Sequence, residues 1–270
     1  MTILVSKVDK YTHFVASAEE ALALAQNFKA EGRFDVFRGQ ARRWTLLSSL
    51  HRLGESRFDE MTERGLLLYQ FMGDNPVLKP YLKNTDHFFA VAQHYGFATN
   101  HVDFTTDPAV ALYFATNSPA NTVLEQACII CVNRVHFQQV MEFTEPLWAK
   151  YMAKKDLRPC FLEMDVKNLW RLQAQKGLFL FTPLAQIENV YPFHRIVFPY
   201  HGPFPGIDIA DIYPVEKSVV ETYLDHFLEA ERTSNNMQRF IKVIGHNKVH
   251  HGSEPNIFDY LLSSCRPHRS

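Results

Sequence analysis

The sequence has few cysteines and no long apolar run. Four cysteines in 270 residues are too few for a disulfide scaffold in a chain of this length, which favours a reducing compartment. Residues 1–11 alternate polar and apolar side chains and lack the apolar core of a signal peptide. No segment approaches the length of a membrane span. We therefore predict a cytoplasmic protein with no membrane partner.

The sequence also lacks an excess of either charge. Lys and Arg together number 28, and Asp and Glu together number 29. Such a balance provides no global basic field of the kind that signals bulk nucleic-acid binding. It leaves room for a local basic groove, because a groove can be positive within a neutral protein.

Metal-binding side chains do not form a recognisable pattern. Cys128 and Cys131 have the spacing of half a zinc site, but they lie in the apolar run 127–132 and no second pair follows at a matching spacing. Free cysteine is among the most buried residue types. The run therefore predicts a core strand, and we predict no metal.

Hydrophobic periodicity and capping residues predict helices and strands at irregular intervals. Helices are expected at 17–30, 57–72, 85–95, 107–117 and 215–232. Strands are expected at 34–37, 102–105, 127–132, 177–181 and 191–197. This mixture favours an α+β fold with a mixed central sheet flanked by helices. We expect one domain over residues 1–245 and a C-terminal tail over 246–270.

Two stretches hold most of the polar chemistry. The first, residues 37–40, reads Phe-Arg-Gly-Gln at the end of a predicted strand, where a guanidinium beside a glycine suits a phosphate or a carboxylate. The second, residues 93–108, places amide, imidazole, phenol, carboxylate and hydroxyl groups before a predicted helix. Helix N-termini accept anions readily. An isolated Arg-Gly pair more often marks a turn, so the two stretches matter in combination.

Together these stretches resemble the FRG domain, a family named for its Phe/Tyr-Arg-Gly motif. The family pattern has Arg-Gly-Gln, Gln-His-Tyr-Gly, Thr-Arg-Leu-Leu-Asp-Trp-Thr and Ala-Leu-Tyr-Phe-Ala in this order, and residues 37–115 are similar to it. This sequence departs from the pattern at Asn100, His101 and Phe104, where the family usually has Arg, Leu and Trp. The missing arginine weakens any ligand clamp that needs two guanidiniums.

A more distant resemblance is to ADP-ribosyltransferases of the Arg-Ser-Glu type. The segments 37–39, 104–106, 111–115 and 127–132 are similar, in order, to that family's arginine strand, Ser-Thr-Ser strand, helix and apolar strand. The resemblance implies an ADP-ribosyltransferase-like fold with NAD as substrate. It also implies that a set of side chains binds NAD: Arg38, Gly39, Gln40, His94, Tyr95, Thr105 and Phe114.

The catalytic glutamate of that family has no matching acid here. Gln175 is in the corresponding place and can bond a ribose hydroxyl, but it supplies no negative charge. Asp103 is the first candidate for the missing carboxylate, ahead of Glu163 and Asp165, and it is equally well explained as a buried carboxylate bonded to turn amides. We take Arg38, Asp103 and Gln175 as the candidate catalytic residues.

The sequence therefore predicts an enzyme, an NAD-dependent ADP-ribosyltransferase that modifies a protein or nucleic acid, with RNA favoured. The basic and aromatic stretch 42–44 follows the signature and is suited to a phosphate backbone. We expect a toxin or antiviral effector, for which an antitoxin or a chaperone is the fitting protein partner. The alternative is a non-catalytic module that senses a nucleotide or nucleic acid. A hydrolase ranks last, because paired carboxylates at metal-binding spacing are absent.

Overall fold

Helices and strands follow one another irregularly along the chain. The computed structural model describes residues 10–53, 58–123, 125–148, 158–163 and 168–233. The strands are β1 (Thr12–Phe14), β2 (Val36–Gln40), β3 (His101–Thr105), β4 (Gln126–Val132), β5 (Cys160–Leu162), β6 (Gly177–Phe181) and β7 (His194–Pro199). The helices are α1 (Ala18–Ala30), α2 (Ser49–Arg52), α3 (Phe58–Asp74), α4 (Thr85–His94), α5 (Pro108–Thr116), α6 (Arg134–Trp148), α7 (Trp170–Ala174), α8 (Ile209–Ile212) and α9 (Val219–Thr233). Short 3₁₀ helices lie at Lys79–Lys83 and Ile187–Asn189.

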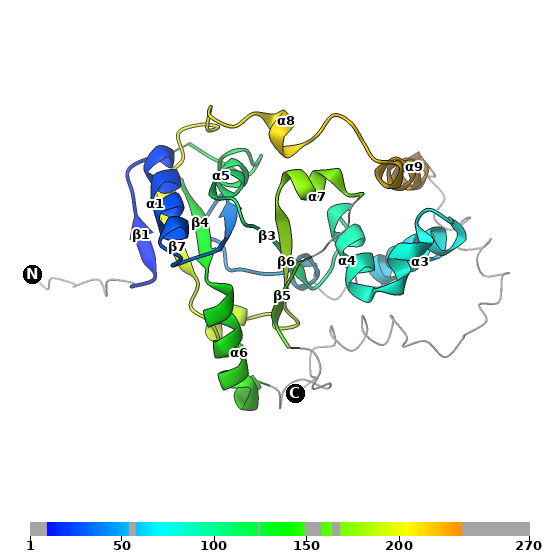
Figure 1. Ribbon diagram of the computed structural model, residues 1–270, viewed down its shortest axis with the longest axis horizontal. Coiled ribbons are helices and arrows are strands. Elements are labelled where there is room, and N and C mark those ends of the chain that lie inside the picture. The colour runs from blue at the N-terminus through cyan, green and yellow to red at the C-terminus, as the bar shows by residue number, and fades with distance from the viewer. Residues whose placement is uncertain (1–9, 54–57, 124, 149–157, 164–167, 234–270) are drawn as a thin grey trace, which may run out of the picture.

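Within the described residues, the strands form a mixed sheet in the order β1-β7-β4-β2-β3-β6-β5 (Figure 1). β1 runs parallel to β7, and the other neighbouring strands are antiparallel. β2 pairs with β4 along its whole length, as β3 does with β6. By contrast, β2 and β3 share a single register pair, Phe37 with Thr105. The sheet thus consists of two groups of strands that meet at one point.

Hydrophobic cores cover both faces of the sheet, but only one of them crosses this junction. On that face, Val36, Phe104 and Leu178 from β2, β3 and β6 belong to one core with Phe137 of α6. On the opposite face, α1 and α5 pack on β4 and β7. A separate core joins α3, α4 and α9 around Phe179 of β6. On this second face, the helices that cover β4 and β7 and the helices that cover β6 therefore form two separate cores, one on each side of the junction between β2 and β3.

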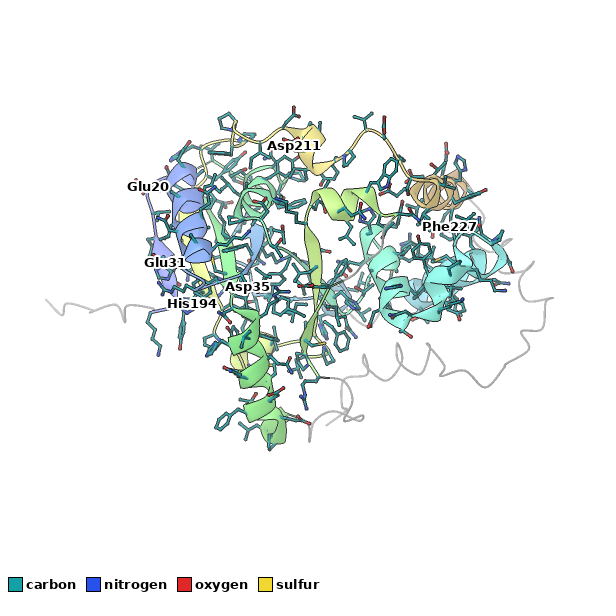
Figure 2. The ribbon with its side chains drawn as sticks, in the orientation of Figure 1. Glu20, Glu31, Asp35, His194, Asp211 and Phe227 are labelled. Carbon is teal, nitrogen blue, oxygen red and sulfur yellow. The ribbon has the colours of Figure 1, made fainter. Side chains whose placement is uncertain are left out.

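Helix α9 closes this separate core. Phe227 points from α9 toward α3 (Figure 2), where its ring centroid lies 4.9 Å from that of Phe71. The helix starts at a capping box: the Ser218 hydroxyl accepts from the Glu221 N–H at 3.1 Å, and the Glu221 carboxylate accepts from the Ser218 N–H at 3.0 Å. The sequence predicted a helix from Val215, and this cap explains the later start.

Helix α5 lies directly on β2 because Gly39 has no side chain. The helix is capped by Asp107, whose carboxylate accepts from the N–H of Ala109 at 2.9 Å. A Cβ atom on Gly39 would lie 1.9 Å from the carbonyl oxygen of Ala111 and 2.6 Å from the nitrogen of Ala115. The sequence predicted that Gly39 opens the backbone to a ligand. In the structure the missing side chain makes room for a helix, and the ligand role of Gly39 stays a prediction.

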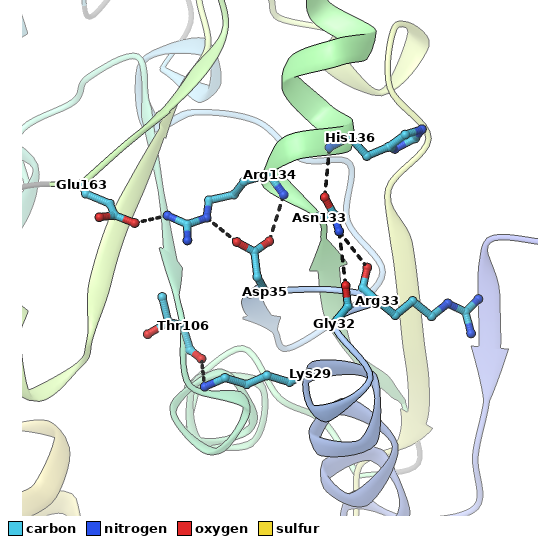
Figure 3. Close-up of polar contacts among 9 residues, drawn as sticks. All are labelled: Lys29, Gly32, Arg33, Asp35, Thr106, Asn133, Arg134, His136 and Glu163. Atoms are coloured by element: carbon cyan, nitrogen blue, oxygen red, sulfur yellow. Dashed lines mark hydrogen bonds and ion pairs between the residues drawn. The ribbon is translucent and has the colours of Figure 1, made fainter.

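Polar contacts fasten the start of β2 to its neighbours (Figure 3). Asp35 accepts from the backbone N–H of Arg134 at 2.9 Å and pairs with its guanidinium, which also binds Glu163. Lys29, in the last turn of α1, donates to the carbonyl of Thr106 at 2.8 Å. These contacts connect α1, β2, α6 and the segment after β3, and so fix the elements on either side of the junction.

The predicted α+β class with a mixed sheet and flanking helices is confirmed. Helices α1, α3, α4 and α5 lie where the sequence predicted them. The strand predicted at 34–37 instead ends at Gln40, since residues 38–40 pair with β4. The strand predicted at 191–197 runs from His194 to Pro199. The sequence did not predict α6, β1 or β5.

Three predictions concern the chain as a whole. The single domain over 1–245 with a tail over 246–270 stays a prediction, because residues 234–270 lie outside the described part. The closer likeness to ADP-ribosyltransferase folds also stays a prediction. As to membranes, none of the helices in the described segments combines the length and the apolar character needed to cross one.

Replacing Gly39 by alanine is expected to lower the free energy of unfolding by about 3 kcal/mol or more, because the added methyl group meets helix backbone that has no room to move. Gly65 is the matched control: it lies inside α3, and a Cβ there meets nothing within 4 Å. Gly65→Ala is expected to stabilise the protein by about 0.5–1 kcal/mol. Urea denaturation measures both. Equal effects at the two positions would contradict the packing argument.

Candidate functional site

A cavity of about 420 Å³ opens where β2 and β3 separate. Small-molecule sites typically measure roughly 300–1,000 Å³, so this one is large enough for a nucleotide. Helix α5 borders it on one side, and α4 and α7 border it on the other. The lining includes Phe37–Gln40 of β2, Asp103–Thr105 of β3, Gly177–Phe179 of β6, Val110 and Phe114 of α5, Gln93 and His94 of α4, and Arg171 and Leu172 of α7.

Arg38 bridges the gap between the two strands. Its Nη1 donates to the carbonyl oxygen of Asp103 at 2.6 Å and lies 3.8 Å from the Asp103 carboxylate. Its side chain is 18% exposed, and its buried Nε has no hydrogen-bond partner in the described segments. Burial lowers the pKa of Arg38, while Asp103 raises it and Arg52 lowers it. The guanidinium remains charged, and its Nε still lacks an acceptor.

Asp103 presents a carboxylate to this cavity. Its side chain is 59% exposed, so it is not the buried, amide-bonded carboxylate that the sequence left open as an alternative. Its carboxylate accepts from Nε2 of Gln93 at 3.0 Å, and Oε1 of Gln93 accepts from the hydroxyl of Thr99 at 2.5 Å. The Gln93 amide is thereby fixed in one orientation. Among the described residues that line the cavity, Asp103 is the only acid.

Thr105 and Gln175 connect the two sides of the cavity. The Thr105 hydroxyl donates to the carbonyl oxygen of Gln175 at 2.7 Å and accepts from the N–H of Asp107 at 3.0 Å. The side-chain amide of Gln175 donates to the carbonyl of Ile212 at 3.3 Å. Both residues line the cavity, as the sequence predicted, but the Thr105 hydroxyl proton is already engaged.

Comparison with protein families gives one match, over residues 34–123, to the model of the FRG domain. This segment of the chain is similar to the FRG domain. Neither the curated proteins nor the solved structures contain a match to it. The matched residues include β2, α4, β3 and α5, and therefore Arg38 and Asp103. Helix α7 and strand β6, which complete the cavity, lie outside the matched segment.

Two further guanidiniums line the cavity: Arg52 from α2 and Arg171 from α7. The usual second arginine of the FRG pattern corresponds to Asn100, which is 4% exposed and lies outside the lining. Arg171 stacks on Tyr213, with its guanidinium carbon 4.6 Å from the ring centroid. Sequence reasoning missed both arginines because neither belongs to a motif. The only signal was the position of Arg171 near Gln175.

The remaining predicted ligand residues fall into two groups. His94 and Phe114 line the cavity; burial and Arg171 lower the pKa of His94 to about 4, so its imidazole is neutral at pH 7. Tyr95 lies outside the lining, and its hydroxyl donates to the carbonyl of Glu221 at 3.2 Å. This contact holds the end of α4 against α9, which is the helix-end packing that a tyrosine before Gly96 also predicts.

Gln40 lines the cavity although it is only 6% exposed. Its Oε1 accepts a long hydrogen bond from Sγ of Cys128, at 3.7 Å. Cys128 and Cys131 lie fully buried in β4, which confirms the predicted core strand. No cluster of three or more metal-ligating side chains is found in the part of the chain that the structure describes.

His101, where the FRG pattern usually has leucine, is a core histidine. It is 2% exposed, and neither ring nitrogen has a hydrogen-bond partner in the described residues. Its ring lies within 6 Å of three phenylalanine rings, those of Phe89, Phe179 and Phe181. Burial lowers the pKa of His101 to about 4. The residue is outside the cavity lining, and its neutral ring packs as an apolar group.

We expect His101→Leu to stabilise the protein, with a gain that grows as the pH falls. The unfolded histidine takes up a proton near pH 6.5, whereas the folded one resists until about pH 4. Wild-type stability therefore drops between these pH values, by about 3 kcal/mol at pH 4. Urea denaturation of both proteins at pH 7.5 and pH 5 measures the difference. A gain that is the same at both pH values would exclude this role for His101.

Proposed function

We propose that the FRG domain of this chain binds NAD in the cavity and transfers its ADP-ribose to a macromolecule. The observation that carries the proposal is the adjacency of the Arg38 guanidinium and the Asp103 carboxylate, 3.8 Å apart at the opening between β2 and β3. A guanidinium suits the diphosphate of NAD. A carboxylate suits the positive charge that develops on the ribose as nicotinamide leaves.

The charge balance of the cavity supports an anionic ligand. Arg38, Arg52 and Arg171 bring three positive charges, whereas Asp103 is the one acid in the described lining. His94 adds no charge at neutral pH, since its pKa is lowered to about 4. Like charges gathered in a partly buried space repel one another unless an anion is present. A diphosphate with two negative charges would restore the balance.

The chemistry assigned to this site is a substitution at C1′ of the nicotinamide ribose. The bond between C1′ and the nicotinamide nitrogen breaks, and its electron pair stays on the departing neutral nicotinamide. An oxygen or nitrogen of the acceptor forms the new bond to C1′ and loses its proton. Asp103 would stabilise the cationic transition state and take up that proton. Gln175, which lines the same cavity, would orient a ribose hydroxyl.

A second candidate is a module that senses a nucleotide without chemistry. Two observations favour it: Asp103 already has Arg38 as a close neighbour, and the Gln175 amide is engaged with the carbonyl of Ile212. The first reduces the negative charge available to a cationic transition state, and the second restricts the amide that would orient a ribose hydroxyl. The proposal of an ADP-ribosyltransferase further includes RNA as the preferred acceptor, a role as a toxin or antiviral effector, an antitoxin or chaperone partner, and a cytoplasmic location.

Arg38→Ala is expected to abolish NAD binding and label transfer, because it removes the charge nearest the proposed diphosphate. The purified protein is incubated with labelled NAD and with separate protein, RNA and DNA fractions, and nicotinamide release is followed in parallel. Arg33→Ala is the control, since Arg33 lies outside the cavity and packs on Phe28. NAD binding without release by the wild type favours the sensor. No binding at all defeats both candidates.

Asp103→Asn is expected to lower kcat by about 100-fold, the usual scale for one electrostatic group in a transition state. KM should change little, because asparagine keeps an oxygen that accepts from Gln93. Gln175→Ala should change kcat by less than about tenfold, since its amide is bonded to Ile212 rather than free. Steady-state nicotinamide release measures all three proteins. A larger loss in Gln175→Ala would reverse the catalytic assignment.

A further inference from the structure

Arg171 is held in place on the side of the cavity opposite α5. Its backbone N–H donates to the carboxylate of Glu221 at 3.2 Å, and its guanidinium stacks 4.6 Å from the ring centroid of Tyr213. Both Arg171 and Tyr213 line the cavity. A stacked guanidinium keeps its edge free for planar contacts with an anion. Among the described residues that line this cavity, Asp103 is the single acid.

The hydrogen-bonding capacity of Arg171 is not used up. Its Nε is buried and has no hydrogen-bond partner within the described ranges. The two carboxylates nearby are already engaged: Glu221 accepts from the N–H groups of Arg171 and Ser218, and Asp225 pairs with Lys217 at 2.5 Å. A buried guanidinium nitrogen without an acceptor is costly, and a ligand oxygen would relieve that cost.

Arg171 and Arg38 belong to different regions of the cavity. Arg38 lies on β2 and contacts Asp103 of β3. Arg171 lies on α7, and its guanidinium stacks on Tyr213. The two guanidiniums thus enter the cavity from different elements, and an anion at Arg38 leaves the Nε of Arg171 without an acceptor.

We infer that Arg171 and Tyr213 form a second anion subsite, separate from the one at Arg38, that binds a phosphate monoester. The inference deepens the proposed function and rests on it for the identity of the nucleotide. Two sources of such a phosphate fit a nucleotide cavity. One is a 2′-phosphate on the adenosine ribose, as in NADP. The other is a terminal phosphate of the acceptor, as in 5′-phosphorylated RNA.

The test measures binding by calorimetry with two matched pairs of probes. The first pair is NADP and NAD, and the second is one RNA oligonucleotide with a 5′-phosphate or a 5′-hydroxyl. Wild-type protein should prefer the phosphorylated member of at least one pair by about tenfold, the scale of one charge-assisted hydrogen bond. The pair that shows the preference identifies the source of the phosphate.

Arg171→Ala should remove that preference, so that this variant binds the phosphorylated and the unphosphorylated member of the pair with affinities within about twofold of each other. Arg171→Lys keeps the charge but loses the planar stacking, so it should retain a part of the preference. If thermal unfolding shows that Arg171→Ala is not folded, Arg171→Lys takes its place in the test. Arg33→Ala, outside the cavity, should behave as the wild type.

Two results would overturn the subsite: no preference within either pair in the wild type, or a preference that is undiminished in the folded Arg171 variant. The failure of the proposed function gives a different result, which is the absence of nicotinamide release. Binding ratios and release are measured separately, so either can fail while the other holds.

Discussion

The structure depends on the single register pair that joins β2 to β3, Phe37 with Thr105. Beyond this pair the two strands separate, and their backbone groups no longer have each other as partners. Buried carbonyl and N–H groups rarely stay unpaired. Arg38 satisfies one of them, since its Nη1 donates to the carbonyl oxygen of Asp103. One arginine therefore both stabilises the opening of the sheet and supplies its positive charge.

The opening is tolerated because the two faces of the sheet are built differently. On the face that α6 covers, one core runs without interruption from β4 through β2 and β3 to β6. On the opposite face, α5 packs closely on β2 because Gly39 has no side chain. Helices α4 and α7 pack on the other group of strands. The continuous face keeps the strands in one sheet. The divided face leaves the cavity that Arg38, Asp103 and Arg171 line.

Much of this arrangement could be predicted from sequence, because it is encoded locally. Asp107 before Pro108 marks the start of α5, and the FRG signature contains both Arg38 and Asp103. Long-range packing could not be read in this way. A glycine after an arginine looks the same whether a ligand or a helix approaches it, and the partner of Gly39 is more than 70 residues further along the chain.

The missed elements have physical reasons of their own. β1 is a three-residue edge strand whose partner, β7, is remote in sequence. Helix α6 exposes Val135, Phe143 and Leu147, so its apolar residues do not form one clean stripe. Arg52 and Arg171 lie in short helices without a motif. Tyr95 was assigned to the ligand from the family resemblance, whereas in the structure its hydroxyl donates to the carbonyl of Glu221 at the helix end.

The positions of the arginines bear on how ligand preference arises in this chain. Asn100 stands where the FRG pattern has its second arginine, and it is buried away from the cavity. Positive charge is instead supplied by Arg52, inside the matched segment, and by Arg171, outside it. Position 100 directly precedes β3 and lies outside the cavity lining, whereas Arg171 lines the cavity from α7. Compared with the FRG pattern, the summed positive charge of the cavity can then suit the same class of anion, while the distances between the arginines differ. For this reason the segment after residue 123, rather than the FRG signature itself, would determine which nucleotide or acceptor fits.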